Sequence, residues 1–140
     1  MKQASLIEKA FLLKKSSLFG NQKLDLLLPI SEKMHSVMLR ANEKIFSCGQ
    51  EAHHMYLIIE GEVDIYLDRG KALARLSSND FFGDEAIFGD QSRKYEAISA
   101  SDTKLLSLSK TNFLSIVAEI PSVALELLRC YASKLQFRER

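Results

Sequence analysis

Residues 79–94 read NDFFGDEAIFGDQSRK and form a long connection within a region that otherwise has the character of short strands. Connections of more than about a dozen residues in a compact domain are usually functional or disordered. The phenylalanine, alanine and isoleucine residues in this one argue against disorder. Their pattern predicts a single helical turn over 85–88 that packs against the neighbouring strands.

This connection also carries residues that favour the binding of a small anion. Gly83 permits close approach of the backbone to a ligand and can adopt a positive φ angle. Arg93 lies beyond the predicted turn and offers a planar set of donors that suits two phosphate oxygens. Asp84 adds an acceptor for a hydroxyl group. An anion site beside a hydroxyl acceptor favours a ribose phosphate as the ligand.

On both sides of the connection, short apolar segments are bounded by Gly, Asn and Asp. The alternation is clearest where Val63, Ile65 and Leu67 alternate with Asp64 and Tyr66, which predicts a strand with one buried face. Many short strands separated by tight turns are typical of a sandwich or a barrel. We expect strands over 35–40, 43–48, 55–60, 62–67, 72–76, 95–101 and 104–108.

Helical periodicity precedes this β-rich region. Leu6, Ala10 and Leu13 have the spacing of one helix face and predict a helix over 5–15. A second, shorter helix is expected over 22–28, and we expect it to stop at Pro29 because the residue before a proline disfavours the helical conformation.

Helical periodicity returns after residue 109. A helix is expected over 112–120, and another is expected to begin at Pro121, where the missing N–H of proline costs nothing. An apolar stripe continues along that last helix. It consists of Val123, Leu127, Leu128, Tyr131 and Leu135.

The pattern around Gly83 resembles the cyclic nucleotide-binding domain family, whose phosphate-binding cassette has a Phe-Gly-Glu sequence, a short helix and an arginine nine residues after the glutamate. Here Phe82, Gly83 and Asp84 are followed by Arg93 at that spacing. Residues 55–63 and 105–108 also look like family landmarks, and the resemblance covers nearly the whole chain. It implies a mainly β fold with flanking helices, namely an eight-stranded antiparallel, jelly-roll-like β-roll with N-terminal and C-terminal helices.

On this basis the 140 residues are expected to form a single domain. The N-terminal helical segment would span 1–34, and the roll would span 35–109 with its cassette at 80–94. The C-terminal helices would span 110–140.

The resemblance also implies roles for particular residues. Arg93 would pair with the cyclic phosphate of cAMP or cGMP, and Gly83 and the N–H groups of Glu85 and Ala86 would line the same anion. Asp84 would accept a hydrogen bond from the ribose 2′-hydroxyl. Three further residues belong to the expected ligand-binding set, namely Phe82, Lys94 and Tyr95. Lys94 either adds positive charge or is solvated, and Tyr95 either stacks on a purine or packs within its strand.

The resemblance implies a regulatory sensor that relays ligand binding through its C-terminal helix to an effector domain or partner protein, with a homodimer as one arrangement. The alternative is a β-roll that retains the fold without binding nucleotide and serves as a protein-interaction or oligomerisation module. The sequence leaves both functions open, because a fold does not establish a function.

Other functional classes find little support in the sequence. Nineteen basic and 18 acidic residues leave a net charge of +1, so no basic surplus favours nucleic acid. The adjacent His53 and His54 and two distant cysteines do not have the spacing of metal ligands, and no nucleophile motif is present. We therefore expect no metal and no enzyme activity. The apolar runs are too interrupted for a membrane segment, so a cytoplasmic location is expected.

Overall fold

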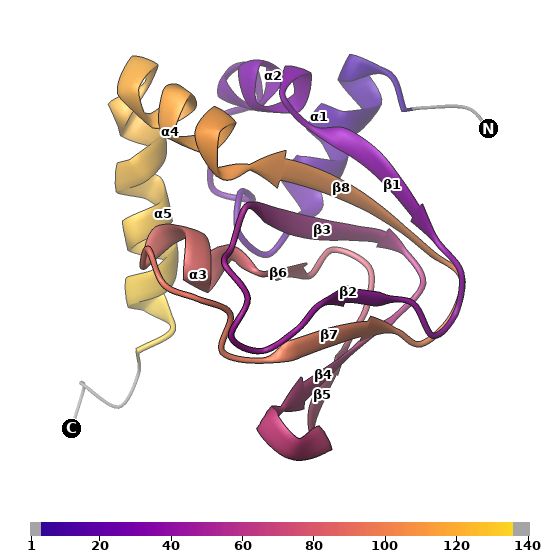
Figure 1. Ribbon diagram of the computed structural model, residues 1–140. Coiled ribbons are helices and arrows are strands. Elements are labelled where there is room, and N and C mark those ends of the chain that lie inside the picture. The colour runs from indigo at the N-terminus through magenta and orange to yellow at the C-terminus, as the bar shows by residue number, and fades with distance from the viewer. Residues whose placement is uncertain (1–3, 136–140) are drawn as a thin grey trace.

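The computed structural model describes residues 4–135, in which two antiparallel sheets form a roll with helices against it (Figure 1). One sheet has the strand order β1-β8-β3-β6 and the other β2-β7-β4-β5. The eight strands confirm the predicted antiparallel roll. They are β1 (His35–Leu39), β2 (Lys44–Phe46), β3 (His54–Glu60), β4 (Val63–Leu67), β5 (Lys71–Leu76), β6 (Phe81–Phe82), β7 (Glu96–Ser99) and β8 (Thr103–Ser109).

Burial within the sheets follows the alternation seen in the sequence. Val63 and Ile65 are buried, whereas Asp64 and Tyr66, which alternate with them along the strand, are only partly buried. The buried side chains form two clusters. The smaller cluster fills the roll between the sheets and includes Phe46, Ile58 and Phe82. The larger one lies between the β1-β8-β3-β6 sheet and the helices. The ligand-binding residues predicted from the sequence therefore border a packed interior.

β2 and β7 are each three residues shorter than predicted, and β6 was not predicted as a strand. β2 ends at Phe46, because the chain then turns and the Ser47 N–H donates to the side-chain oxygen of Gln50. β7 covers only part of the strand predicted over 95–101. β6 lies inside the long connection and exists because it pairs with Tyr56 and Leu57 of β3. Such pairing depends on a distant partner and leaves no periodicity in a two-residue segment.

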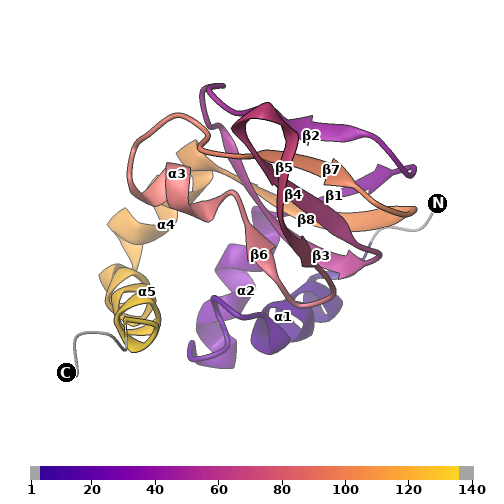
Figure 2. The same ribbon diagram turned by 90° about the horizontal axis from the view of Figure 1, so that it is seen from below.

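The N-terminal helices cover one face of the roll (Figure 2). Helix α1 (Leu6–Lys15) begins at Ser5, whose hydroxyl accepts a hydrogen bond from the Glu8 N–H in a capping box. Helix α2 (Leu24–Glu32) continues through Pro29, so the predicted stop there was wrong. Leu27 and Ile30 lie on either side of the proline and are fully buried, so packing outweighs the lost backbone hydrogen bond.

The C-terminal helices close the other end of the molecule. Helix α4 (Lys110–Glu119) starts earlier than predicted because Ser109 caps it by accepting from the Asn112 N–H. Helix α5 (Pro121–Ser133) begins at its proline as predicted. Leu128 and Leu135 are not part of the packed stripe, because they are 67% and 38% exposed and Leu135 lies beyond the end of α5. Residues 136–140 of the predicted helical segment lie outside the described residues.

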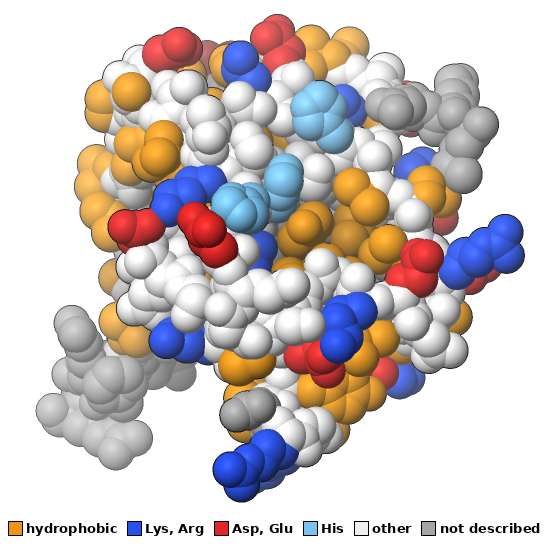
Figure 3. Space-filling model, in the orientation of Figure 1, with side chains coloured by type: hydrophobic (Ala, Val, Ile, Leu, Met, Phe, Trp, Pro, Cys, Tyr) orange, Lys and Arg blue, Asp and Glu red, His pale blue; other side chains and the backbone are white. Residues whose placement is uncertain are grey.

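Helix α5 is held against the N-terminal layer as well as against α4. The Gln22 side-chain amide donates to the Val123 carbonyl at 3.0 Å, and the Cys130 thiol donates to the Ser17 carbonyl at 3.4 Å. Hydrophobic side chains gather over α4 and α5 at the left edge of Figure 3, while basic and acidic side chains are interspersed over the rest of that face. Within residues 4–135, no helix is both long and apolar enough to cross a membrane.

Candidate functional site

The site is built around the turn between β6 and a short helix, α3 (Asp84–Phe88). Gly83 occupies this turn with a φ of 78°, in the left-handed region that side chains disfavour. A Cβ atom at this position would lie 2.8 Å from Nη1 of Arg93 and 3.3 Å from the Phe46 ring. Glycine is therefore required both for the backbone conformation and for the close approach of the arginine.

The backbone of Arg93 is fixed by the turn that follows β2. The Arg93 N–H donates to the Gln50 carbonyl at 2.8 Å, and the Gly49 N–H donates to the Arg93 carbonyl at 2.7 Å. Residues far apart in the sequence thus place this side chain next to Gly83.

The Arg93 guanidinium lies inside the roll and is bound by carbonyl groups. Arg93 is only 4% exposed. Nη1 donates to the Gly83 carbonyl at 2.7 Å, and Nη2 donates to the His54 carbonyl at 2.5 Å. The guanidinium carbon lies 4.0 Å from the centroid of the Phe46 ring, which is a cation–π geometry.

The buried charge of Arg93 is incompletely satisfied. Among residues 4–135, none of the ion pairs involves this arginine, and its Nε–H has no hydrogen-bond partner. Burial lowers the pKa of Arg93, although an arginine of this kind remains charged. Arg93 is therefore a buried cation with no ion pair among residues 4–135 and one unused donor, a combination that favours an anionic ligand.

Tyr95 occupies the space in front of Gly83. Its hydroxyl accepts a hydrogen bond from the Gly83 N–H at 2.7 Å and donates to Oε1 of Glu85 at 3.1 Å. The ring packs on Phe46 with a centroid separation of 5.5 Å. Burial and the charge of Glu85 raise the pKa of the tyrosine, so the hydroxyl is protonated and available as a donor.

Asp84 faces the opposite way, toward helix α5. The residue is 8% exposed, and its carboxylate accepts a hydrogen bond from the Tyr131 hydroxyl. Burial, together with the nearby charge of Glu85, raises the pKa of Asp84 to about 6. The aspartate therefore joins the cassette to the C-terminal helix.

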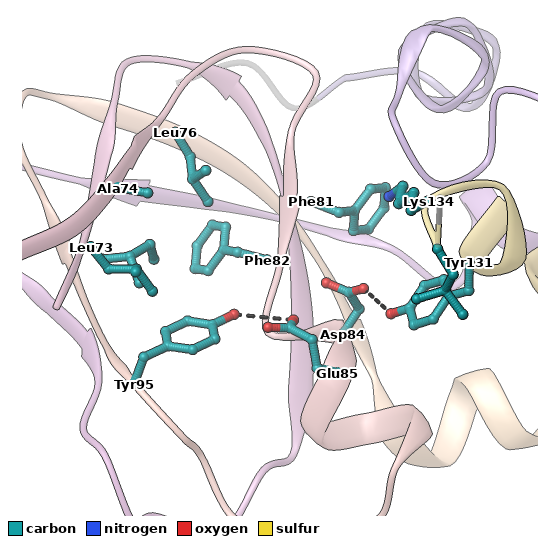
Figure 4. Close-up of a pocket in the computed structure, with 12 residues that line it drawn as sticks. Leu73, Ala74, Leu76, Phe81, Phe82, Asp84, Glu85, Tyr95, Tyr131 and Lys134 are labelled. Atoms are coloured by element: carbon teal, nitrogen blue, oxygen red, sulfur yellow. Dashed lines mark hydrogen bonds between the residues drawn. The ribbon is translucent and has the colours of Figure 1, made fainter. Parts of the chain in front are cut away.

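Two cavities meet at Tyr95 and Glu85, which line both. The smaller one, about 220 Å³, is lined by Gly83, Glu85, Ala86, Gln91, Arg93, Lys94 and Tyr95. The larger one, about 430 Å³, lies between the roll and α5 (Figure 4). Its lining includes Leu73, Leu76, Phe81, Phe82, Asp84, Tyr131 and Lys134. The structure thus brings six of the eight predicted site residues to the smaller cavity, whereas Phe82 and Asp84 border only the larger one.

The sequence between β1 and α4 identifies the family. Residues 36–119 match the cyclic nucleotide-binding domain family, and this match covers more than half of the chain. The chain belongs to the cyclic nucleotide-binding domain family. The proteins that it resembles include a protein kinase regulatory subunit and a cyclic AMP receptor protein.

Relatives with this domain are considerably longer than the matched region. A cAMP-dependent protein kinase regulatory subunit of Colletotrichum orbiculare is 28% identical over 95 residues, which cover 67% of this chain and 24% of that subunit. The cyclic AMP receptor protein of Thermus thermophilus is 27% identical over 96 residues, which cover 66% of this chain and 44% of that protein.

The fold also matches solved structures of regulatory proteins. The N-terminal domain of a transcriptional regulator from Streptomyces coelicolor superposes with a TM-score of 0.80 and is 23% identical in sequence. The comparison covers 91% of this chain and 94% of the other. At this level of identity the similarity establishes the roll architecture and nothing about the ligand.

Three residues at the candidate site of this cyclic nucleotide-binding domain were not predicted from the sequence. Phe46 supplies the face on which Arg93 lies, His54 contributes a backbone carbonyl, and Tyr131 binds Asp84 from α5. Tyr131 was expected only as part of an apolar stripe, and its hydroxyl gave no separate signal. Among the described residues, no group of three or more His, Cys, Asp or Glu is placed to hold a metal ion.

Proposed function

We propose that this domain senses cyclic nucleotide, cAMP or cGMP, by binding the cyclic phosphate beside Arg93 and Gly83. The observation that carries the proposal is the Arg93 guanidinium, which is buried, has no carboxylate partner among residues 4–135 and retains an unused Nε–H. Burying a charge without a counter-ion is costly, so binding of an anion at this point relieves a cost already present in the free domain.

The two cavities suit the two parts of such a ligand. The phosphate occupies the smaller cavity, and the sugar and base extend into the larger one, whose lining is mostly apolar. Glu85 lines both cavities and supplies the acceptor for the sugar hydroxyl. Asp84, to which the sequence assigned this role, is already bonded to Tyr131 and borders only the larger cavity.

Helix α5 is the element through which the ligand signal leaves the roll. It borders the larger cavity through Tyr131, with Lys134 just after its end, and Tyr131 is hydrogen-bonded to Asp84 of the cassette. A ligand shifts the position of α5 only to the extent that it binds one arrangement more tightly than another. The receiver is an effector domain, a partner protein or a second copy of this chain in contact with the exposed leucines of α5.

Thermal unfolding with and without nucleotide tests the binding proposal. Millimolar cAMP or cGMP should raise the melting temperature, because a ligand that binds only the folded state at about 100 times its dissociation constant stabilises it by about 2.7 kcal/mol. Arg93→Leu should abolish this shift. Arg75→Leu is the matched control, since Arg75 is exposed, pairs with Asp64 and lines neither of the two cavities.

Absence of any shift with either nucleotide would contradict the binding proposal and support a protein-interaction role for the roll. If either nucleotide raises the melting temperature, titration calorimetry against both identifies the preferred base. Limited proteolysis at the junction of Ile120 and Pro121, where the backbone leaves the helical conformation between α4 and α5, tests the relay. Identical cleavage with and without ligand would contradict it.

A further inference from the structure

We propose that Tyr95 is an internal occupant of the nucleotide site, a side chain that makes within the domain the same two contacts a cyclic nucleotide would make. This inference rests on the proposed function and specifies how the same site is controlled. Tyr95 lies in the boundary between the smaller and larger cavities, across the path that a ligand spanning both must take.

The equivalence between Tyr95 and the ligand is chemical. The Tyr95 hydroxyl accepts the Gly83 N–H, which is the donor that a phosphate oxygen would use. The same hydroxyl donates to Glu85, as a sugar hydroxyl would. One group thus supplies both the acceptor of a phosphate and the donor of a ribose. The Gly83 N–H has one proton to donate, and the Tyr95 hydroxyl occupies the space between it and Glu85, so ligand and tyrosine compete for this position.

The packing of the ring explains why the occupied arrangement is stable without ligand. The Tyr95 ring packs against Phe46 in a tilted arrangement, and the Arg93 guanidinium lies over the face of Phe46. Figure 4 shows the Tyr95 ring reaching from the roll toward Glu85, with the hydroxyl at the carboxylate. Removal of the tyrosine from this position would expose the Gly83 N–H and free the carboxylate of Glu85. Both are then available to the ligand.

Competition of this kind lowers the apparent affinity for nucleotide. When the binding-competent arrangement is only a fraction of the population, the apparent dissociation constant rises by the inverse of that fraction. The competition also selects for ligand chemistry. A ligand with both an anion and a neighbouring hydroxyl replaces both tyrosine contacts, whereas inorganic phosphate replaces only the contact to Gly83.

The test is titration calorimetry with the cyclic nucleotide that stabilises the wild-type domain, applied to Tyr95→Phe and Tyr95→Ala. Tyr95→Phe keeps the ring against Phe46 and removes both hydroxyl contacts, so the affinity should rise by about fivefold to tenfold. Tyr95→Ala also opens the boundary between the cavities and should raise it further. Tyr66→Phe is the matched control and should leave the affinity unchanged, because Tyr66 lines neither cavity.

A second measurement does not depend on affinity. The amide resonance of Gly83, one of six glycines in the chain, should move in the Tyr95→Phe protein without ligand. It should also move in the wild-type domain when nucleotide is added, because in both cases the tyrosine hydroxyl leaves the N–H.

The outcomes separate this inference from the proposed function. If the wild-type domain binds nucleotide and Tyr95→Phe binds it no more tightly, the tyrosine is not a competitor and the inference is wrong while the function stands. Weaker binding by Tyr95→Phe would make the tyrosine a ligand contact and would also overturn the inference. If neither the wild-type domain nor any tyrosine variant binds either nucleotide, both the function and the inference fail.

Discussion

Asp84 and Glu85 are consecutive carboxylates at the start of one short helix, yet they face opposite sides of the ligand cavity. Glu85 is exposed and accepts a hydrogen bond from Tyr95 on the roll side. Asp84 is buried and accepts one from Tyr131 on the helix side. The first contact joins two parts of the roll, whereas the second joins the roll to α5.

This difference in burial separates two properties of the domain. On the helix side, burial raises the pKa of Asp84 to about 6, so the contact with α5 depends on pH. On the roll side, the contact between Tyr95 and Glu85 lies in front of Gly83 and Arg93, so the proposed ligand would displace it. Neighbouring residues of one chain segment thus respond to different signals.

Replacement of Gly83 by alanine should have the largest effect, because it disturbs the turn that precedes both carboxylates. The added Cβ would lie 2.8 Å from Nη1 of Arg93, and the φ of 78° is unfavourable for alanine. We expect the free energy of unfolding to fall by about 3 to 4 kcal/mol, measured by urea denaturation. Gly49→Ala is the control, since its φ is 89° but nothing lies within 4 Å of its Cβ. It should cost only about 1 kcal/mol, and equal losses would disprove a steric role for Arg93.

Asp84→Asn should remove the pH dependence that Asp84 gives to the free energy of unfolding. The raised pKa means that the folded state holds the proton more tightly than the unfolded state, whose value is near 3.8. The stability contributed by protonated Asp84 is therefore present below about pH 4 and is lost as the pH rises to about 6. At pH 7.5 we expect Asp84→Asn to be more stable than the wild type by about 2 to 3 kcal/mol, and at pH 4 nearly equal to it.

The control for this prediction is Asp90→Asn. Asp90 is exposed and paired with Lys110, which lowers the pKa of Asp90. Loss of the Asp90 charge should therefore lower the stability at neutral pH, whereas Asp84→Asn should raise it. Thermal unfolding between pH 4 and 8 measures both variants. A constant difference between wild type and Asp84→Asn across that range would show that the aspartate does not titrate there.

Tyr131→Phe should have a smaller, pH-dependent effect. It removes the hydroxyl that donates to Asp84 and leaves an ionised buried carboxylate without that partner, at a cost of about 1 to 2 kcal/mol at pH 7.5. At pH 4 the loss should be smaller, because Asp84 is then protonated. Thermal unfolding of the wild type and of Tyr131→Phe at pH 4 and at pH 7.5 measures both losses. Equal losses at the two pH values would refute a contact that depends on the ionisation of Asp84.

Lys94→Ala should have the smallest effect. Lys94 lines the smaller cavity but is exposed to solvent, so its charge is largely screened at 150 mM salt. We expect nucleotide affinity to weaken by about twofold by titration calorimetry. Lys134→Ala, at the exposed rim of the larger cavity, provides the comparison on the helix side. A loss of a hundredfold for Lys94→Ala would place this lysine in direct contact with the phosphate.

Local signals in the sequence accounted for most of the fold. The alternation of Val63 and Ile65 identified a strand, and the proline at position 121 marked the start of α5. Other features depended on tertiary contacts. The continuation of α2 through Pro29 follows from the burial of Leu27 and Ile30, and β6 exists through its pairing with β3. Neither leaves a pattern in its own segment.

For the site, spacing located the residues but not their directions. The interval from Asp84 to Arg93 placed the arginine beside Gly83, where the structure has it. Nothing in the sequence indicated that Asp84 would turn toward Tyr131, 47 residues away, or that the Tyr95 hydroxyl would lie on the Gly83 N–H. Those contacts depend on how α5 and β7 pack, and therefore on the whole core.

The hydrogen bond from Gln22 to the Val123 carbonyl connects the beginning of the described chain to its last helix. The same helix receives the Asp84 contact from the cassette, so α5 is restrained from two independent directions. A shortened protein that lacks α1 and the segment around Gln22 would release one of these restraints. Its last helix would be loosened before any nucleotide is added, and ligand-dependent movements measured on such a fragment would be misleadingly small.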